Sequence, residues 1–377
     1  MQKNNDSIFL KKRFTIPTVI ILLLAVIYLW FVFAPVSFIR YWRDIYIETA
    51  MTTADHQWLA TAFIPGYIID EIMAKKTDTS DVLGGGQHLA PKDPETEAPV
   101  IETEPQITAD ILGQGQLSVG DTDYAGYEVV INDVEQGLVV SEITGTSYRG
   151  KIMLIDDPAR VYLGTTPYKN QEGLRIKAMM AHYGAIAGIN ASGFNDPNDS
   201  GHGGDVIGLT CSDGEFWGTA VSYYGSVLLT SDNKLVVGNV SDWENYDIRA
   251  GIQFGPVLIA DGEAKIEGSG GYGIQPRTAI GQREDGVIVF LIIDGRQPTW
   301  SIGCTMGDLI EILQKYGVVN AACCDGGSSS VLAYNGEVIT KNSSLNPTYG
   351  RRLPNAWLVA PKVTDTDSEA SEVTAND

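Results

Sequence analysis

The run "VIVFLII", residues 287–293, limits the possible folds more than any other part of the sequence. Seven consecutive apolar residues of this kind are typical of a central strand that is buried on both faces of a sheet. Apolar residues recur at helical spacing over 305–316, and Thr305 followed by Asp308 resembles a capping box at the start of a helix. A second apolar run covers 318–324. This order predicts a β-α-β unit.

Short β-favouring runs elsewhere are bounded by Gly, Asp, Asn and Pro, which are typical turn residues. They read "YEVVI", "GLVVSEI", "KIMLI", "SVLLT", "KLVV" and "AWLVA". A further amphipathic helix is predicted over 173–183. Together these patterns predict an α+β fold, with a β-rich, mixed-sheet catalytic domain over 107–361 and the β-α-β unit near its C-terminal end.

The N-terminal part contains "FTIPTVIILLLAVIYLWFVFA", residues 14–34, without a charged side chain. A helix of this length rises about 31 Å, which matches the hydrocarbon layer of a bilayer. We therefore predict a single-pass transmembrane anchor over 14–38. Basic residues before it place residues 1–13 in the cytoplasm and the catalytic domain outside the cell membrane. A cleaved signal peptide is the alternative, but its apolar core is normally shorter and no small-residue cleavage site follows Ala34.

Three segments outside this domain differ in composition. Residues 39–76 mix aromatic and charged residues and predict one or two short juxtamembrane helices. Residues 77–106 are rich in Pro, Gly, Thr and Glu, which predicts a flexible acidic linker, and 362–377 resemble a disordered acidic tail. The net charge of −21 argues against a nucleic-acid partner, because nucleic acids require a basic binding surface.

The four cysteines allow two interpretations. Cys323 and Cys324 are adjacent, so their side chains point to opposite faces of a strand and do not share one partner. A disulfide from one of them to Cys304 or Cys211 is possible in an oxidising compartment. Buried free thiols are the favoured interpretation. A zinc site made of cysteines is not expected, because the sequence has no CxxC pair.

Polar residues follow both strands of the β-α-β unit. "IIDGRQ" carries Asp294 and Arg296, and "CCDGGSSS" carries Asp325, Gly326, Gly327 and Ser328. Ligands of such units bind at the carboxyl ends of the strands, so we expect both carboxylates at the same edge of the sheet. The alternative is that these Asp-Gly and Gly-Gly pairs are ordinary turns.

Two further segments add polar groups to this predicted site. "IQPRTAIG" contributes Arg277, and "GINASGF" contributes Asn190 after another predicted strand. A guanidinium can hold a phosphate with two hydrogen bonds, and free backbone N–H groups after Asp325 could form an anion-binding nest. Two carboxylates are the usual groups that break a bond at the anomeric carbon of a sugar.

The segment "DPNDSG" matches the opening of a calcium loop through Asp196, Asn198 and Ser200. The twelfth position of the loop is Ile207 where calcium loops have glutamate, so a loop stabilised by its own Asp and Asn side chains is favoured. We expect no required cofactor, and the sequence assigns no metal ligands otherwise.

The segment "IDGRQPTWSIGCTMGDLIEILQKYGVVNAACCDGGSSSVLAYNGE", with "GINASGF", "GIQFGPVLIADGE", "PRTAIGQREDG" and "RRLPNAWLV", resembles the phosphodiester glycosidase family over about residues 183–359. The family includes an enzyme that removes N-acetylglucosamine from a phosphodiester, and bacterial members are associated with exopolysaccharide biosynthesis. The resemblance implies a site that contains Asn190, Arg277, Asp294, Arg296, Asp325 and Ser328.

Together with the predicted membrane anchor, this resemblance implies an extracytoplasmic hydrolase of glycosyl phosphodiesters of the cell envelope or of exopolysaccharides. We expect Arg277 and the backbone near Ser328 to bind the phosphodiester. Either Asp325 or Asp294 would act as base toward water, or as nucleophile. The expected partners are a glycan or sugar-phosphodiester substrate and the membrane. The alternatives are a non-catalytic glycan-binding module of the same fold and a glycosyl-phosphate transferase.

Overall fold

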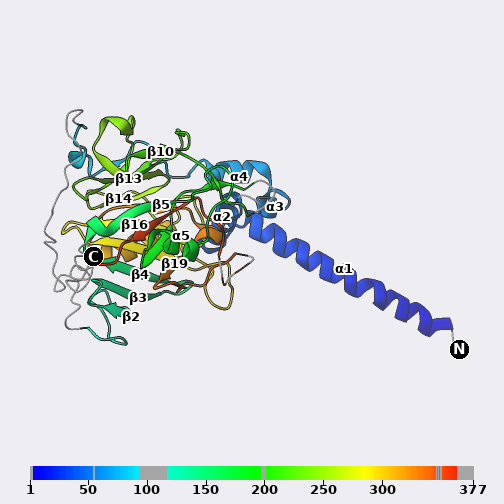
Figure 1. Ribbon diagram of the computed structural model, residues 1–377. Coiled ribbons are helices and arrows are strands. Elements are labelled where there is room, and N and C mark those ends of the chain that lie inside the picture. The colour runs from blue at the N-terminus through cyan, green and yellow to red at the C-terminus, as the bar shows by residue number, and fades with distance from the viewer. Residues whose placement is uncertain are drawn as a thin grey trace, which may run out of the picture. The chain divides into compact units, whose positions relative to one another are not determined.

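The computed structural model describes residues 3–53, 56–92, 117–196, 201–344, 346, 348 and 350–362, with side chains from residue 17 onward. The chain divides into two compact units (Figure 1). The first comprises Met1–Lys76 together with Gly271–Gly273, and the second comprises Thr77–Gly270 and Ile274–Asp377.

The first unit is helical. It contains α1 (Lys3–Phe33), α2 (Ser37–Met51), α3 (Trp58–Thr61) and α4 (Gly66–Met73), so the predicted juxtamembrane segment 39–76 holds three helices rather than one or two. Its core is formed by Val32, Ile47, Ala50, Ala60, Ile64, Ile68, Ile69 and Ile72. His56, in the connection between α2 and α3, is exposed.

The predicted anchor over 14–38 is not one continuous helix. The helix ends at Phe33, and the chain bends by 88° before α2 begins at Ser37. Pro35 explains the break, because proline lacks an N–H and disfavours helical geometry in the preceding residue. Among the described residues, only the pair Pro17–Phe33 and Ser37–Met51, taken together, has the length and apolar character of a membrane span.

The second unit consists mainly of strands. An eight-stranded sheet has the order β15 (Glu263–Ala264), β14 (Val257–Ala260), β18 (Val318–Cys324), β16 (Arg277–Arg283), β17 (Ile288–Ile293), β4 (Arg149–Ile155), β3 (Leu138–Thr144) and β2 (Glu128–Asp133). A six-stranded sheet has the order β1 (Leu83–Gly84), β12 (Leu235–Gly238), β11 (Ser226–Thr230), β13 (Ile248–Gln253), β9 (Thr210–Ser212) and β10 (Glu215–Trp217).

Smaller elements complete this unit. A five-stranded sheet has the order β20 (Glu337–Val338), β19 (Leu332–Tyr334), β6 (Ala187–Asn190), β21 (Asn355–Val359) and β5 (Val161–Thr165). β7 (Phe194–Asn195) pairs with β8 (Asp205–Val206). The helices are α5 (Ile176–Tyr183) and α6 (Met306–Lys315), with 3-10 turns η1 (Gly86–His88), η4 (Pro158–Arg160), η6 (Trp243–Asn245) and η7 (Gly327–Ser329). The prediction of a β-rich α+β fold is confirmed.

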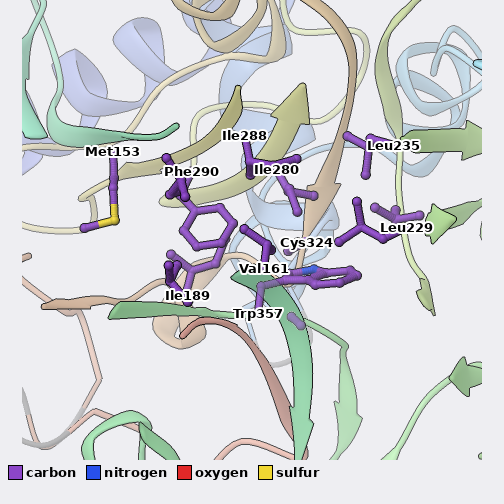
Figure 2. Close-up of a cluster of buried hydrophobic side chains, with 14 of the residues drawn as sticks. Met153, Val161, Ile189, Leu229, Leu235, Ile280, Ile288, Phe290, Cys324 and Trp357 are labelled. Atoms are coloured by element: carbon purple, nitrogen blue, oxygen red, sulfur yellow. The ribbon is translucent and has the colours of Figure 1, made fainter. Parts of the chain in front are cut away.

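The inner faces of the three larger sheets share one core. Figure 2 shows Phe290, Ile280 and Ile288 from the eight-stranded sheet above Ile189, Val161 and Trp357 from the five-stranded sheet. Leu229 and Leu235 of the six-stranded sheet close the same cluster. The predicted strand over 287–293 therefore lies in the middle of the core, as its apolar sequence indicates.

The β-α-β unit is confirmed, with one correction to the sheet. β17 and β18 are both antiparallel to β16, so they run parallel to each other with β16 between them. Thr305 and Asp308 form the predicted capping box at the start of α6. Every described strand pairing is antiparallel, so the prediction of a mixed sheet is wrong: the two parallel strands do not share hydrogen bonds.

The predicted linker over 77–106 is wrong for residues 77–92. β1 pairs with β12, the Lys92 N–H bonds the Asn245 carbonyl, and Thr79 is buried. The glycines in this segment permit its close approach, because a Cβ at Gly84 would lie 2.5 Å from the Asn320 amide oxygen. Residues 93–106, the predicted domain start at 107 and the tail from 363 lie outside the described residues.

Two smaller predictions are also tested. Lys362, the first residue of the predicted tail, donates its backbone N–H to Gln136, so this residue is part of the folded domain. All four cysteines are buried free thiols, which confirms the favoured interpretation.

Candidate active site

The register of the central strands brings the two predicted carboxylates to one edge. Arg277 lies opposite Ile293 of β17, and Thr278 lies opposite Cys324 of β18. Asp294 and Asp325 are the next residues of these strands, so both leave the sheet at the edge where β16 begins. This part of the sequence prediction is confirmed.

Asp325 lies half-buried at the end of β18, and its backbone N–H bonds the Ala191 carbonyl at 2.9 Å. Burial raises the pKa of its carboxyl group to about 6. The Ser329 hydroxyl, the Arg351 guanidinium, the Gly326 N–H and the Arg296 guanidinium each lower this pKa in part. The carboxyl group is therefore poised between its two protonation states close to neutral pH.

Arg296 and Arg351 supply positive charge around the loop after Asp325. The Arg296 Nη2 bonds the Gln275 side-chain oxygen at 2.8 Å, and its guanidinium lies against Gly327, where a Cβ would be 3.1 Å away. The Arg351 Nη1 lies 3.4 Å from the Ser328 hydroxyl. Arg296 is exposed and Arg351 is half-buried, so solvent reaches both residues.

Arg351 is also fixed from behind. It forms an ion pair with Asp196, and its guanidinium lies 4.6 Å from the centre of the Phe194 ring. Arg351 was not identified as a site residue from the sequence, although it lies in "RRLPNAWLV". The sequence offers one signal for this residue, the pair Arg351 and Arg352 directly before a predicted strand. Its approach to Ser328 depends on tertiary folding between residues far apart in the chain.

Asn190 lies beneath the site. It is fully buried, donates to the Asp325 carbonyl at 2.6 Å, and accepts from the Thr278 hydroxyl at 2.9 Å and from the Val331 N–H at 3.1 Å. These bonds fix the end of β18 against β6 and β16. Asn190 thus holds the end of β18, and with it Asp325, in place. Its contact with a substrate stays a prediction.

In the loop after Asp325, where the sequence predicts an anion-binding nest, three N–H groups already have hydrogen-bond partners within the protein. The Gly327 N–H bonds the Pro276 carbonyl at 3.0 Å, and the N–H groups of Ser329 and Ser330 bond the carbonyls of Gly326 and Gly327. Gly327 has φ +62°, a left-handed conformation that glycine adopts without strain, and it starts the turn η7. The two glycines thus shape a tight turn. Contact of Gly326, Gly327 and Ser328 with a phosphate stays a prediction.

Asp294 has different surroundings. One of its carboxylate oxygens accepts from the Trp300 indole at 2.8 Å and the other from the Lys341 backbone N–H at 3.0 Å. The Arg149 guanidinium and the Lys341 ammonium group lie 4.7 Å and 3.8 Å from the centre of the Trp300 ring. Burial raises the pKa of Asp294 to about 6, and these hydrogen bonds lower it in part. Both carboxylate oxygens accept a hydrogen bond from the protein, which holds Asp294 in its loop. Its predicted catalytic role stays a prediction.

Arg277 lies on the other face of the sheet from Thr278. Opposite residues of paired strands share a face, which puts Arg277 on the side of Ala279 and Cys323, where Cys323 contacts Met306 of α6. Burial raises the pKa of the Cys323 thiol to about 12, and the Arg277 guanidinium lowers it in part. The two guanidinium groups that lower the pKa of Asp325 are those of Arg351 and Arg296.

Aromatic side chains also lie near Asp325. The negative charge of Asp325 adds to the burial that raises the pKa of Tyr224 to about 12, so the two groups are close. The rings of Tyr223 and Tyr224 are 4.7 Å apart, and those of Tyr224 and Phe254 are also 4.7 Å apart. Tyr223 is 65% exposed. We call Tyr223, Tyr224 and Phe254 the aromatic wall; the sequence analysis did not identify it.

The structure tests part of the calcium hypothesis. Asp196 accepts from the Gly201 N–H at 2.7 Å and pairs with Arg351, which places an arginine where a cation would compete. Asn198 and Ser200 lie outside the described residues. Within the part of the chain that is described, no cluster of three His, Cys, Asp or Glu side chains is arranged to hold a metal ion.

A half-buried aspartate, two guanidinium groups and the aromatic wall, through Tyr224, thus lie near the end of β18. Such an arrangement suits a ligand that combines an anion with a ring that has an apolar face. Residues 183–360 match the sequence profile of the phosphodiester glycosidase family, so the resemblance seen in the sequence is confirmed over this range.

Similar proteins include the SPβ prophage-derived protein YomE of Bacillus subtilis (strain 168), which is 30% identical over 230 residues. The match covers 58% of this chain and 33% of YomE, so the chain spans about a third of the length of this relative. The catalytic domain of zebrafish N-acetylglucosamine-1-phosphodiester alpha-N-acetylglucosaminidase, auto-inhibited by its pro-peptide, has a TM-score of 0.48 at 20% identity and covers 60% of this chain and 82% of its own. A Synechocystis protein has a TM-score of 0.46 at 14% identity, covering 60% and 62%.

Proposed function

We propose that this protein hydrolyses glycosyl-1-phosphodiesters, releasing a free sugar and a phosphate monoester. The main support is the arrangement around Asp325, where a carboxyl group lies near the guanidinium groups of Arg351 and Arg296. The match of residues 183–360 to the phosphodiester glycosidase family supports the same class of substrate.

In the proposed reaction, Arg351 and Arg296 bind the phosphodiester. The bond between the anomeric carbon and the phosphate oxygen breaks, and its electron pair stays on that oxygen. A water oxygen bonds to the anomeric carbon, and its proton passes to the Asp325 carboxylate, which acts as base. Negative charge grows on the departing phosphate, so the two guanidinium groups stabilise the transition state more than the ground state. This route gives inversion at the anomeric carbon, whereas a nucleophilic Asp325 would give retention.

The aromatic wall supports the orientation of the substrate in this proposal. A sugar ring with an apolar C–H face would pack against Tyr223 and Tyr224, with its anomeric carbon toward Asp325. The arginines would then hold the phosphate. This assigns the sugar and the phosphate to different sides of the carboxyl group.

We further propose that the enzyme acts at the outer side of the cell membrane, on glycans of the envelope or on exopolysaccharides. The large apolar side chains of α1 from Val19 to Trp30, which include Leu24 and Ile27, are exposed in the structure. Lys11, Lys12 and Arg13 precede this region, which favours a cytoplasmic N-terminus. Labelling of intact cells with an amine reagent that does not cross membranes should modify the catalytic domain; labelling only after lysis would contradict this orientation.

The activity test compares adjacent arginines. The full chain is incubated with a set of methyl-phosphodiesters of sugar 1-phosphates, and free sugar is measured together with its anomeric form. We expect Arg351→Ala to lower kcat/KM by about 10²-fold, as expected for loss of a donor to developing charge. Arg352→Ala, which removes an ion pair with Glu172 instead, should change kcat/KM less than about threefold.

Three results would contradict the proposal. If the wild-type protein hydrolyses none of these phosphodiesters, the proposed hydrolase activity is wrong. If Arg351→Ala and Arg352→Ala lower kcat/KM equally, the role assigned to Arg351 is wrong. Transfer of the sugar to an added alcohol in preference to water would show a transferase.

A further inference from the structure

A cavity lies at the opposite end of the eight-stranded sheet from Asp325. It has a volume of about 670 Å³ and is lined by Tyr124, Arg283, Gln314, Lys315 and Tyr316 among others. Arg277 and Arg283 are the two ends of β16, and Arg283 lies opposite Val318, the first residue of β18. At a rise of about 3.3 Å per residue, the cavity is about 20 Å from the candidate active site.

Three tyrosine rings form one side of this region. The Tyr124 ring meets the Tyr316 ring edge to face at 5.4 Å, and the Tyr127 ring is stacked on Tyr316 at 6.3 Å. Tyr316 is buried and donates its hydroxyl to Asp123 at 2.6 Å, so it is held in place. Tyr124 is 57% exposed. A large ring that remains exposed beside a fixed aromatic cluster offers an apolar surface to a ligand.

The polar groups of the cavity are preorganised and balanced in charge. The Arg283 guanidinium bonds Asp285 at 2.5 Å and the Tyr124 hydroxyl at 3.1 Å. Arg283 and Lys315 contribute two positive charges, while Glu284 and Asp285 contribute two negative charges. A strongly anionic or cationic ligand would face like charges here, at a cost in binding free energy.

We propose that this cavity binds a neutral saccharide. Sugar hydroxyls both donate and accept hydrogen bonds, which matches a rim that combines guanidinium, ammonium, amide and carboxylate groups. Sugar rings also present apolar C–H faces that pack against tyrosine. The cavity is open to solvent, and its volume lies within the range of clefts that bind small organic ligands. The cavity thus holds a part of the glycan remote from the bond that is broken, a role beyond the proposed hydrolysis.

The test measures binding and needs no turnover. The full chain, in a detergent without a sugar head group, is titrated by calorimetry with neutral tetrasaccharides of glucose, galactose, mannose and N-acetylglucosamine. We expect at least one to bind, and Tyr124→Ala to weaken its binding about tenfold or more. Tyr168→Ala, a matched change of another exposed tyrosine, and Asp325→Asn should leave this binding unchanged.

A second cavity variant, a kinetic control and two charged oligosaccharides complete the test. Gln314→Ala changes an exposed side chain at the rim, so it should fold normally and weaken binding about threefold or more even if Tyr124→Ala is unstable. Tyr124→Ala should keep wild-type rates on small soluble phosphodiesters. The proposal is overturned if no tetrasaccharide binds, if an acidic oligogalacturonate or a cationic chitosan oligomer binds more tightly, or if Asp325→Asn abolishes binding while the cavity variants do not.

Discussion

At the scale of single residues, two aspartates that look alike in the sequence differ in the structure. Both follow a buried strand and precede a glycine, and the sequence correctly predicts that they leave the sheet at one edge. Their partners separate them. Trp300 and Lys341 each donate a hydrogen bond to one oxygen of Asp294, while Asp325 lies near the guanidinium groups of Arg351 and Arg296. No local pattern could reveal this, because Lys341 and Arg351 reach the site from distant segments.

This difference predicts opposite effects of two matched substitutions. Asp325→Asn should lower kcat by about 10²–10⁴-fold with little loss of stability, because it removes the base but keeps the shape. Asp294→Asn should reduce the free energy of unfolding by about 1–3 kcal/mol, because the amide cannot accept from both Trp300 and Lys341. Its kcat should stay within about threefold. Steady-state kinetics and denaturant unfolding measure the two effects; a dead, stable Asp294→Asn would reverse the assignment.

The raised pKa of Asp325 predicts the acid side of the pH profile. The base must be ionised, so kcat/KM should fall about tenfold per pH unit below the pKa of about 6 and level off above it. We do not expect this loss of kcat/KM to come from unfolding of the protein caused by protonation of Asp294 or Asp325. A carboxyl whose pKa is raised by folding contributes most to stability below its unfolded pKa, and this contribution is lost as the pH rises through its folded pKa. A midpoint near pH 4 would contradict the assignment.

At the scale of elements, the sequence predicts where strands and helices lie along the chain, but it does not predict which strands pair in the sheets. The β17–α6–β18 unit follows from apolar periodicity and the capping residues of α6. The position of β16 between β17 and β18 does not, because its pairing with β18 joins segments about 40 residues apart in the sequence. The aromatic wall was missed for the same reason: Tyr224 precedes β11 and Phe254 follows β13, and the pairing of these strands brings them together.

The aromatic wall predicts a selective effect on substrate binding. Tyr223→Ala should raise KM for a hexosyl phosphodiester about tenfold, with kcat within about threefold, because the exposed ring binds the sugar without reacting. Tyr223→Phe should behave like the wild type, and Tyr168→Ala serves as the control for loss of an exposed tyrosine elsewhere. Steady-state kinetics of the four proteins gives the comparison. An unchanged KM in Tyr223→Ala would place the sugar elsewhere.

At the scale of the whole molecule, the composition separates a helical unit from a β-rich unit, but it misplaces the start of the latter. The Gly-rich residues 84–86 look like linker, yet glycines are what allow this segment to pack closely in the six-stranded sheet. The apolar character of residues 14–34 predicts a helix correctly, and the break before Ser37 follows from Pro35. The proposal that this helix inserts into a membrane rests on its exposed apolar side chains.

Charged residues placed on that helix provide the test of membrane association. Leu24 and Ile27 are each 61% exposed, so their replacement does not disturb packing within the protein. The wild-type chain should float with phosphatidylcholine vesicles in a density gradient. Leu24→Lys combined with Ile27→Lys should leave most of the protein at the bottom, because each lysine costs about 2.5–3.5 kcal/mol at the centre of a membrane helix. Leu24→Ala combined with Ile27→Ala, the matched control, should still float, since alanine carries no charge into the bilayer. Flotation of the lysine variant, or failure of the wild type to float, would show that α1 does not insert into a bilayer.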